Sequence, residues 1–554
     1  MKSSQVDVIV VGAGLAGLRA VHSVREAGFT VQALEAASGI GGVWHWNRYP
    51  GARCDVESYD YSYSFSEELE QEWRWTERYA TQPEILRYIE HVADRFDLRR
   101  YVKLNTRVVK AQFDEDSSRW TVQTEHGEQY DAAYVIMATG QLSVTKLPEI
   151  EGFDDFAGQV LHTGQWPHDP VDFTGKRVGV IGTGSSGVQL IPIVAREAAH
   201  LTVFQRTPTF TVPANNRPID DVEDADIKAR YATRREAARM SANGLGFDPG
   251  KKSLLEATEA ERIQRLEQQY QAAGFGFALA YPDILLDEKA NEKVADFLRE
   301  KIRLKVQDPR TAERLTPYGY PFGAKRPAVD SGYYEAFNRD NVSLVDISAE
   351  PLERITVDGL VAGGREHELD VIVFATGFDA LTGSLLKPTI VGRAGQTLRE
   401  KWAAGPVTYL GLGTTGFPNL FIIAGPGSPS VLANVLLGIE QHVDWIVQLL
   451  HTARARGVAE IEATPEAEHA WVEHVNERAR RTLYLKAASW YLGADVPGKP
   501  RVFMPYTGGH RGYRRICDEV AANDYEGFDL ITGSEVAQRR TDRQSHEVES
   551  ATAR

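Results

Sequence analysis

Short, unbroken apolar runs followed by glycines are the first pattern along this chain. Residues 6–11 (VDVIVV) and 177–181 (RVGVI) show no alternation with polar residues, as expected of parallel strands buried on both faces. Each run leads into a glycine loop, then into apolar residues at helical spacing, and then into a second strand (FTVQALE or LTVFQRTP). This order is typical of a doubly wound α/β fold. The pattern predicts an α/β protein with two Rossmann-type dinucleotide-binding domains.

The first glycine loop has the spacing GxGxxG, formed by Gly12, Gly14 and Gly17. A lone match of this kind is weak evidence, but a strand precedes it and a helix follows it. The glycines allow a tight turn and let a pyrophosphate approach the helix N-terminus. Glu35 ends the next strand, where an acid can bind ribose hydroxyls. The first site is therefore expected to hold an unphosphorylated adenosine ribose.

The second loop repeats the spacing with Gly182, Gly184 and Gly187. Gln205 stands where the first unit has its acid, and Arg206 follows immediately. An acid repels a ribose 2′-phosphate, whereas an arginine pairs with it. The second site is expected to bind NADP.

Three later segments narrow the first nucleotide to FAD, with NADPH as the reductant. Residues 134–140 and 370–377 each read as a strand ending in Ala-Thr-Gly, of the kind that returns the chain between the domains of two-dinucleotide flavoproteins. Residues 418–427 (PNLFIIAGPG) look like the strand and loop beneath a flavin. Between the two parts of the NADP unit, residues of about 220–310 are rich in Glu, Arg, Lys and Ala, which predicts a packed helical insertion with solvated charges.

Composition excludes several function classes. The chain has 554 residues, too many for one core, and its net charge of −15 argues against a general nucleic-acid binder. No apolar run is long enough to cross a bilayer. Cys54 and Cys517 form no CxxC pair, which argues against a disulfide reductase and a structural metal and favours a cytoplasmic location. An enzyme with both FAD and a dedicated NADP domain is suited to reductive activation of O2.

Two longer motifs connect the chain to a known family. Residues 156–167 (FAGQVLHTGQWP) fit F-x-G-x3-H-x3-W-P, and residues 41–55 (GGVWHWNRYPGARCD) fit a second fingerprint of the same family. Over roughly residues 5–530 the chain resembles the Baeyer–Villiger monooxygenases, most closely those of the phenylacetone-oxidising type. Residues 324–334 (AKRPAVDSGYY) are more similar to the cyclohexanone-oxidising type.

The resemblance implies a reaction. NADPH reduces FAD, O2 forms a C4a-peroxyflavin, and attack on a ketone gives an ester or lactone, with sulfoxidation as a side activity. Arg326 matches the family's catalytic arginine and would hold the oxyanions, with Asp55 as its orienting catalytic partner. His162 matches a linker position associated with domain movement, so we expect a hinge or network residue there.

The resemblance also implies cofactor contacts. Trp44 and Tyr61 match flavin-contacting positions, Lys325 joins Arg206 and Thr207 at the NADP phosphate, and Trp490 lies near the nicotinamide ribose. Further cofactor contacts are expected at Asp55, Val56, Val108, Thr183, Ser185, Ser186, Gln189 and Arg326. Asp495 stands where the family usually has Asn.

The predicted organisation nests one domain inside the other. The expected segments are the FAD domain (1–146 and 377–533), the NADP domain (147–212 and 322–376), the helical insertion (213–321) and a disordered tail (534–554). The expected partners are a small ketone and O2, with no nucleic acid and no membrane, for a monomer or weak oligomer. Two alternatives stay open: an N- or S-oxidising flavin monooxygenase, and a nucleotide-binding redox sensor without turnover.

Overall fold

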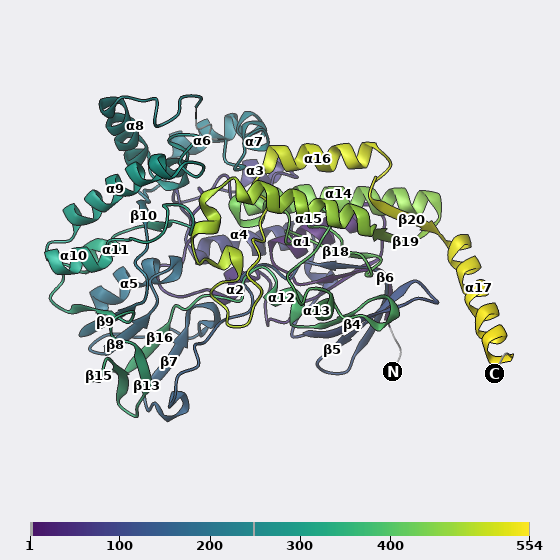
Figure 1. Ribbon diagram of the computed structural model, residues 1–554, viewed down its shortest axis with the longest axis horizontal. Helices are drawn as coiled ribbons and strands as arrows, with labels where there is room; N and C mark the ends of the chain where they lie inside the picture. Colours follow the sequence, from purple (N-terminus) through teal and green to yellow (C-terminus); the bar gives the residue numbers. More distant parts are fainter. Residues whose placement is uncertain (1–3, 247–249, 553–554) are drawn as a thin grey trace.

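The computed structural model describes residues 4–246 and 250–552, and its two largest sheets are separate (Figure 1). The larger sheet runs β17-β4-β5-β6-β1-β2-β3, with β18 paired to β6. Its strands are β1 (Ser4–Val11), β2 (Val31–Leu34), β3 (Val102–Lys103), β4 (Val108–Asp114), β5 (Arg119–Thr124), β6 (Gln129–Met137), β17 (Thr389–Val391) and β18 (Leu420–Ile422). The antiparallel strands β4 and β5 form one side, and the strands around β1 are parallel. The first predicted dinucleotide unit is therefore the centre of this sheet.

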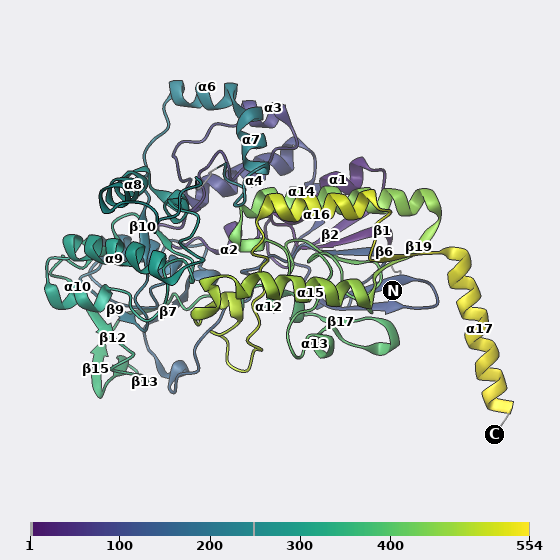
Figure 2. The same ribbon diagram turned by 45° about the horizontal axis from the view of Figure 1, so that its top comes forward.

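Helices cover this sheet and bury its apolar strands. α1 (Leu15–Glu26) packs against the long α14 (Val435–Arg456), and α14 runs beside α16 (His510–Ala522), as Figure 2 shows. Their apolar residues join those of β1 in one core. The other helices of this half are α2 (Val43–Trp46), α3 (Glu67–Glu72), α4 (Gln82–Arg95), α12 (Gly383–Leu386), α13 (Leu398–Lys401) and α15 (Pro465–Arg480).

The smaller sheet is entirely parallel, in the order β12-β9-β8-β16-β7. Its strands are β7 (Gln159–His162), β8 (Arg177–Ile181), β9 (His200–Gln205), β12 (Val342–Asp346) and β16 (Val371–Phe374). Helix α5 (Ser185–Glu197) follows β8, as the second glycine loop predicts. An antiparallel unit of β13 (Leu352–Ile355), β14 (Gly359–Ala362) and β15 (Arg365–Glu368) packs on it.

The predicted insertion is helical and lies beside the smaller sheet (Figure 1). Its helices are α6 (Asp221–Ala229), α7 (Tyr231–Arg239), α8 (Glu259–Ala272), α9 (Glu288–Lys305) and α10 (Pro309–Leu315), with the 3-10 helix η4 (Gly274–Leu279). Strands β10 (Thr211–Pro213) and β11 (Ala328–Asp330) pair at its base, and α11 (Tyr333–Ala336) leads back into the sheet.

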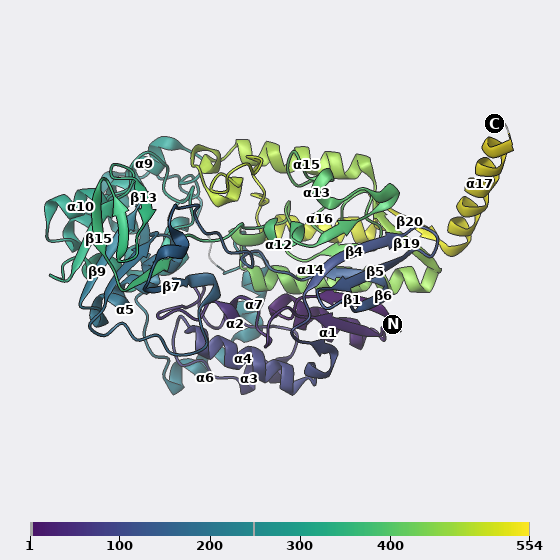
Figure 3. The ribbon, with the colours of Figure 1, turned by 90° about the horizontal axis from the view of Figure 1, so that it is seen from below.

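The C-terminal stretch differs from the sequence-based expectation. Composition predicts disorder over 534–554, whereas the structure has α17 (Gly533–Thr552), which projects from the rest of the chain in Figures 1–3. Thr532 and Glu535 satisfy each other's backbone N–H groups at its start, so the helix is capped. It follows β20 (Phe528–Thr532), which pairs antiparallel with β19 (Val458–Ala463). Residues 553–554 lie outside the described residues.

Within the described ranges, no helix combines the length and the apolar character required to cross a bilayer.

Candidate functional site: two nucleotide loops and an arginine–aspartate pair

The first glycine loop requires glycine for steric reasons. Gly12 has φ +104°, and a Cβ there would lie 2.6 Å from the carbonyl oxygen of Ala138. A Cβ at Gly17 would lie 1.9 Å from the carbonyl oxygen of Gly12. Gly14 caps α1, so the free N–H groups of that helix face the loop. The loop therefore brings backbone and helix N-terminus together as a pyrophosphate requires.

Glu35 is buried beside this loop and tied to it. Its carboxylate accepts the backbone N–H groups of Ala13 at 2.6 Å and Ala37 at 2.8 Å. Burial raises the pKa of Glu35, and these two N–H groups oppose that shift. Each carboxylate oxygen keeps a further lone pair, so the residue fits its predicted part in binding a ribose.

We expect Glu35→Gln to weaken FAD binding about tenfold, because one acceptor becomes an N–H2 group that faces a backbone donor. Flavin fluorescence released on dilution of the holoenzyme measures the dissociation constant. Unchanged FAD affinity would contradict this role.

The second loop repeats the same geometry. Gly182 has φ +109°, and a Cβ there would lie 2.5 Å from the carbonyl oxygen of Ala375. A Cβ at Gly187 would lie 2.2 Å from the carbonyl oxygen of Gly182. At Gly184 a Cβ would have no atom within 4 Å, so the space before α5, which begins at Ser185 and Ser186, is open. Both loops thus fit a dinucleotide.

Arg206 and Lys325 form a pair of cations near the second loop. Neither has an ion pair within the described part of the chain, and Arg206 is exposed. The Lys325 ammonium lies 4.8 Å from the ring centroid of Tyr320. Burial and then the charge of Arg206 lower the pKa of Lys325. The charge of Asp495 opposes this shift. Two cations that form no ion pair with a carboxylate in the described part of the chain fit a phosphate.

Arg326, which lies just before β11, and Asp55, which lies in the loop after α2, form an ion pair between distant parts of the chain. Arg326 Nε lies 2.8 Å from one carboxylate oxygen of Asp55, and Nη2 lies 3.0 Å from the other. Nη1 donates to the carbonyl of Val431 at 2.7 Å. Burial acts to lower the pKa of Arg326, but the charge of Asp55 outweighs it and raises that pKa. The guanidinium is therefore permanently charged and held in a bidentate pair.

Other predicted residues take definite places. Trp44 Nε1 donates to the Tyr61 hydroxyl at 3.2 Å, and both side chains are buried. Thr183 Oγ1 donates to the carbonyl of Thr207 at 3.2 Å, which joins the loops after β8 and β9. Val56 is buried next to Asp55, and Val108 begins β4.

Gln189 makes contacts within the protein, and its predicted cofactor contact stays a prediction. Its amide oxygen accepts from the Tyr49 hydroxyl at 2.8 Å, and its amide nitrogen donates to the carbonyl of Arg53 at 3.1 Å. Gln189 thus joins α5 to the segment that leads into Asp55.

Trp490 lies on the 3-10 helix η8 (Trp490–Leu492) and is half-buried. It packs near Val431, whose carbonyl binds Arg326. Asp495, the departure from the family pattern, pairs with Lys146 at 2.9 Å.

Residues of the linker motif make several contacts with other parts of the chain. His162 Nδ1 accepts the Gly164 N–H at 2.9 Å, and Nε2 lies 3.3 Å from the carbonyl oxygen of Lys146. Burial lowers the pKa of His162, so the ring is neutral. The Trp166 N–H donates to the carbonyl of Trp46 at 3.3 Å. A Cβ at Gly158 would lie 2.4 Å from the carbonyl oxygen of Asp370. The motif therefore contacts segments of both glycine-loop units, and the hinge or network role of His162 stays a prediction.

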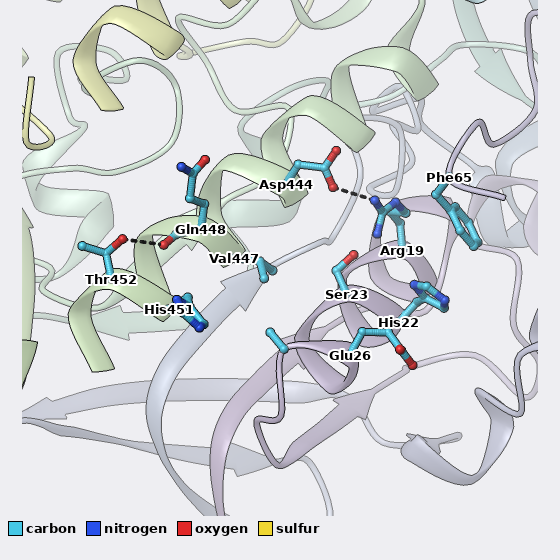
Figure 4. A pocket seen from close by; sticks show the side chains of 11 residues that line it. Arg19, His22, Ser23, Glu26, Phe65, Asp444, Val447, Gln448, His451 and Thr452 are labelled. Atoms are coloured by element: carbon cyan, nitrogen blue, oxygen red, sulfur yellow. Dashed lines mark hydrogen bonds and ion pairs between the residues drawn. The ribbon is translucent and has the colours of Figure 1, made fainter. Parts of the chain in front are cut away.

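A separate cavity of about 600 Å³ opens between α1 and α14 (Figure 4). Figure 4 shows Arg19 pointing to Asp444, with Nη2 and Oδ1 2.5 Å apart. None of the predicted site residues lines this cavity. We assign it no part in the nucleotide sites.

Comparisons with known proteins agree with this geometry. A family model described as "Flavin-binding monooxygenase-like" matches residues 5–221. A Baeyer–Villiger monooxygenase from Pseudooceanicola batsensis is 43% identical over 94% of this chain and 95% of its own. A phenazine N-monooxygenase from Lysobacter antibioticus is 43% identical over 95% of this chain and 97% of its own. The solved structure of an oxidized steroid monooxygenase bound to NADP is 55% identical, with a TM-score of 0.92, over 96% of this chain and 100% of that one.

Full-length identity at this level confirms the resemblance, the α/β fold with two Rossmann-type domains, and the FAD and NADP cofactors. The phenylacetone-like detail stays a prediction. The chain belongs to the Baeyer–Villiger monooxygenases, FAD-containing and NADPH-dependent enzymes that convert ketones to esters or lactones.

Proposed function

We propose that Arg326 is the catalytic residue of this monooxygenase and that Asp55 acts through it as a positioning residue. The observation that carries the proposal is the bidentate contact between the two side chains, at 2.8 and 3.0 Å. A guanidinium fixed in this way presents its remaining N–H groups in one direction.

The chemistry that FAD supplies when bound is acceptance of a hydride from NADPH and activation of O2 for transfer to a ketone. Trp44 and Tyr61 would line its site, with the first glycine loop at its pyrophosphate. Arg206, Lys325 and Thr207 would hold the 2′-phosphate of NADP, and Ser185 and Ser186 would receive its pyrophosphate at the start of α5.

Arg326 stabilises negative charge on substrate oxygen. When a ketone carbonyl carbon is attacked, its oxygen becomes an oxyanion that needs a preorganised donor. The Arg326 N–H groups not bound to Asp55 or Val431 can donate to it, and the permanent charge of Arg326 keeps them available.

For the substrate, we propose an apolar ketone of steroid size. Support comes from the 55% identity to a protein described as a steroid monooxygenase, higher than the 43% to the other relatives above. We also propose O2 as co-substrate, sulfoxidation as a side activity, a cytoplasmic location and a monomer or weak oligomer. The two cysteines are free and buried, which supports the location.

Nitrogen oxidation is the second candidate reaction, because a phenazine N-monooxygenase is as similar as the Baeyer–Villiger relative. The holoenzyme with NADPH and O2 should be given a steroid ketone, phenylacetone, cyclohexanone, an aromatic amine and a sulfide. We expect the steroid ester or lactone to form with the highest kcat/KM, identified by mass spectrometry. An N-oxide as the main product would overturn the ketone assignment, and preference for phenylacetone would overturn the substrate size.

A further inference from the structure

The guanidinium of Arg326 is held by three separate parts of the chain. Asp55 comes from the loop after α2, and the Val431 carbonyl comes from the 3-10 helix η6 (Ser430–Leu432) before α14. The third contact comes from the helical insertion: the Arg326 guanidinium carbon lies 4.4 Å from the ring centroid of Phe275. The insertion therefore reaches the proposed catalytic residue.

The backbone before Phe275 is shaped to bring this ring into place. Gly274 has φ +69°, and a Cβ there would lie 2.1 Å from the Tyr79 hydroxyl oxygen. Ala273 also has a positive φ, of 70°. The chain thus turns tightly against Tyr79 immediately before Phe275. Phe275 is half-buried and packs against both the insertion core and the core around the larger sheet.

The contact is electrostatically favourable. The face of an aromatic ring attracts a cation, and the attraction strengthens where water is excluded. Asp55 fixes one edge of the guanidinium and Val431 accepts from Nη1. The N–H groups that make these hydrogen bonds lie in the plane of the guanidinium. The Phe275 ring, over which the guanidinium carbon lies, adds a contact that does not use these N–H groups and so further restricts the orientation of the plane.

We propose that Phe275 is a positioning residue that sets the orientation of the Arg326 guanidinium, so that the helical insertion takes part in oxygen transfer. The inference rests on the catalytic role proposed for Arg326. Loss of the ring leaves the charge and the Asp55 pair in place. We therefore expect a partial loss, of roughly 3- to 10-fold, in ester formed per NADPH oxidised, with hydrogen peroxide released instead.

The test compares three variants of the holoenzyme. Phe275→Leu keeps apolar bulk but removes the aromatic face, and Phe275→Trp keeps the face. Phe277→Leu is the matched control, because Phe277 lies on the same 3-10 helix, is fully buried, and stacks on Phe297 with centroids 6.0 Å apart. Ester yield per NADPH, the dissociation constant of NADP+, Tm and crystal structures of both leucine variants are measured.

We expect Phe275→Leu to lose coupling with an unchanged NADP+ dissociation constant, Phe275→Trp to restore coupling, and Phe277→Leu to lower Tm alone. The crystal structure should show the Arg326 guanidinium displaced only in Phe275→Leu. Wild-type coupling and an unmoved Arg326 in Phe275→Leu would overturn the inference, as would equal uncoupling in Phe277→Leu. Absence of ester from the wild type would instead refute the proposed function, while the Arg326 position still tests this inference.

Discussion

Replacing Arg326 with alanine is expected to abolish ester formation while leaving NADPH oxidation measurable. The charge of Arg326 is needed when substrate oxygen becomes negative, after hydride transfer is complete. Loss of one preorganised oxyanion donor typically costs about 100- to 1000-fold in turnover. Because Asp55 would then be left without its partner, the full effect should lie at the upper end of that range.

Measuring the rate of flavin reduction and the rate of ester formation separately distinguishes a catalytic role of Arg326 from a general loss of folding. Single-turnover bleaching of the bound flavin by NADPH reports the first half of the reaction, and chromatography of the ester reports the second. Arg393→Ala is a suitable control, because it removes a half-buried arginine whose partners, Glu460 and Glu462, lie on β19. Arg326→Lys should recover part of the activity at most, since an ammonium cannot pair bidentately with Asp55. An Arg326→Ala enzyme that made ester at the wild-type rate would refute the assignment.

Arg206→Ala should raise the KM for NADPH by about 10- to 100-fold, from the loss of a charge-assisted bond to the 2′-phosphate. The KM for NADH should barely change, because NADH has no such phosphate. In Arg206→Ala only Lys325 would contact the phosphate, so the double variant with Lys325→Ala should have a still higher KM for NADPH. Steady-state kinetics measure the KM for NADPH and the KM for NADH in the wild type and in each variant.

Arg196→Ala provides the control for this change, since Arg196 is exposed at the far end of α5 from the glycine loop. Its KM for NADPH should match the wild type. Equal use of NADH and NADPH by the wild type would show that Arg206 does not select the cofactor.

Much of the fold was predictable because glycine loops leave a local signature. The strands, the glycines and the contrast between Glu35 and Arg206 are all readable within about 30 residues of each other in each unit. The two Ala-Thr-Gly segments could be predicted as strand ends. Their close packing against the glycine loops could not be predicted, because the contacts of Ala138 with Gly12 and of Ala375 with Gly182 join residues more than 120 positions apart.

The site was predictable only in part. Arg326 and Asp55 are 271 positions apart, and their pairing was predicted from the family resemblance and not from the spacing of the residues. Phe275 and the Val431 carbonyl were not predicted, because an aromatic side chain in a helical insertion and a backbone oxygen in a 3-10 helix carry no sequence signal. The helix α17 was not predicted, because its polar composition was interpreted as disorder and the cap formed by Thr532 at its start was not considered.

The nesting of one sheet within the other has a consequence for biosynthesis. The larger sheet starts first, with β1, but is completed only when β18 has been made, and α14 covers α1 later still. The smaller sheet starts later, with β7, yet has all its strands once β16 has left the ribosome. Domains fold as units during synthesis. The NADP half can therefore reach its native state while the FAD half, begun earlier, still exposes β6 without β18. A chain that ends between residues 380 and 415 contains every strand of the smaller sheet but lacks β18, so it should bind NADP without holding FAD.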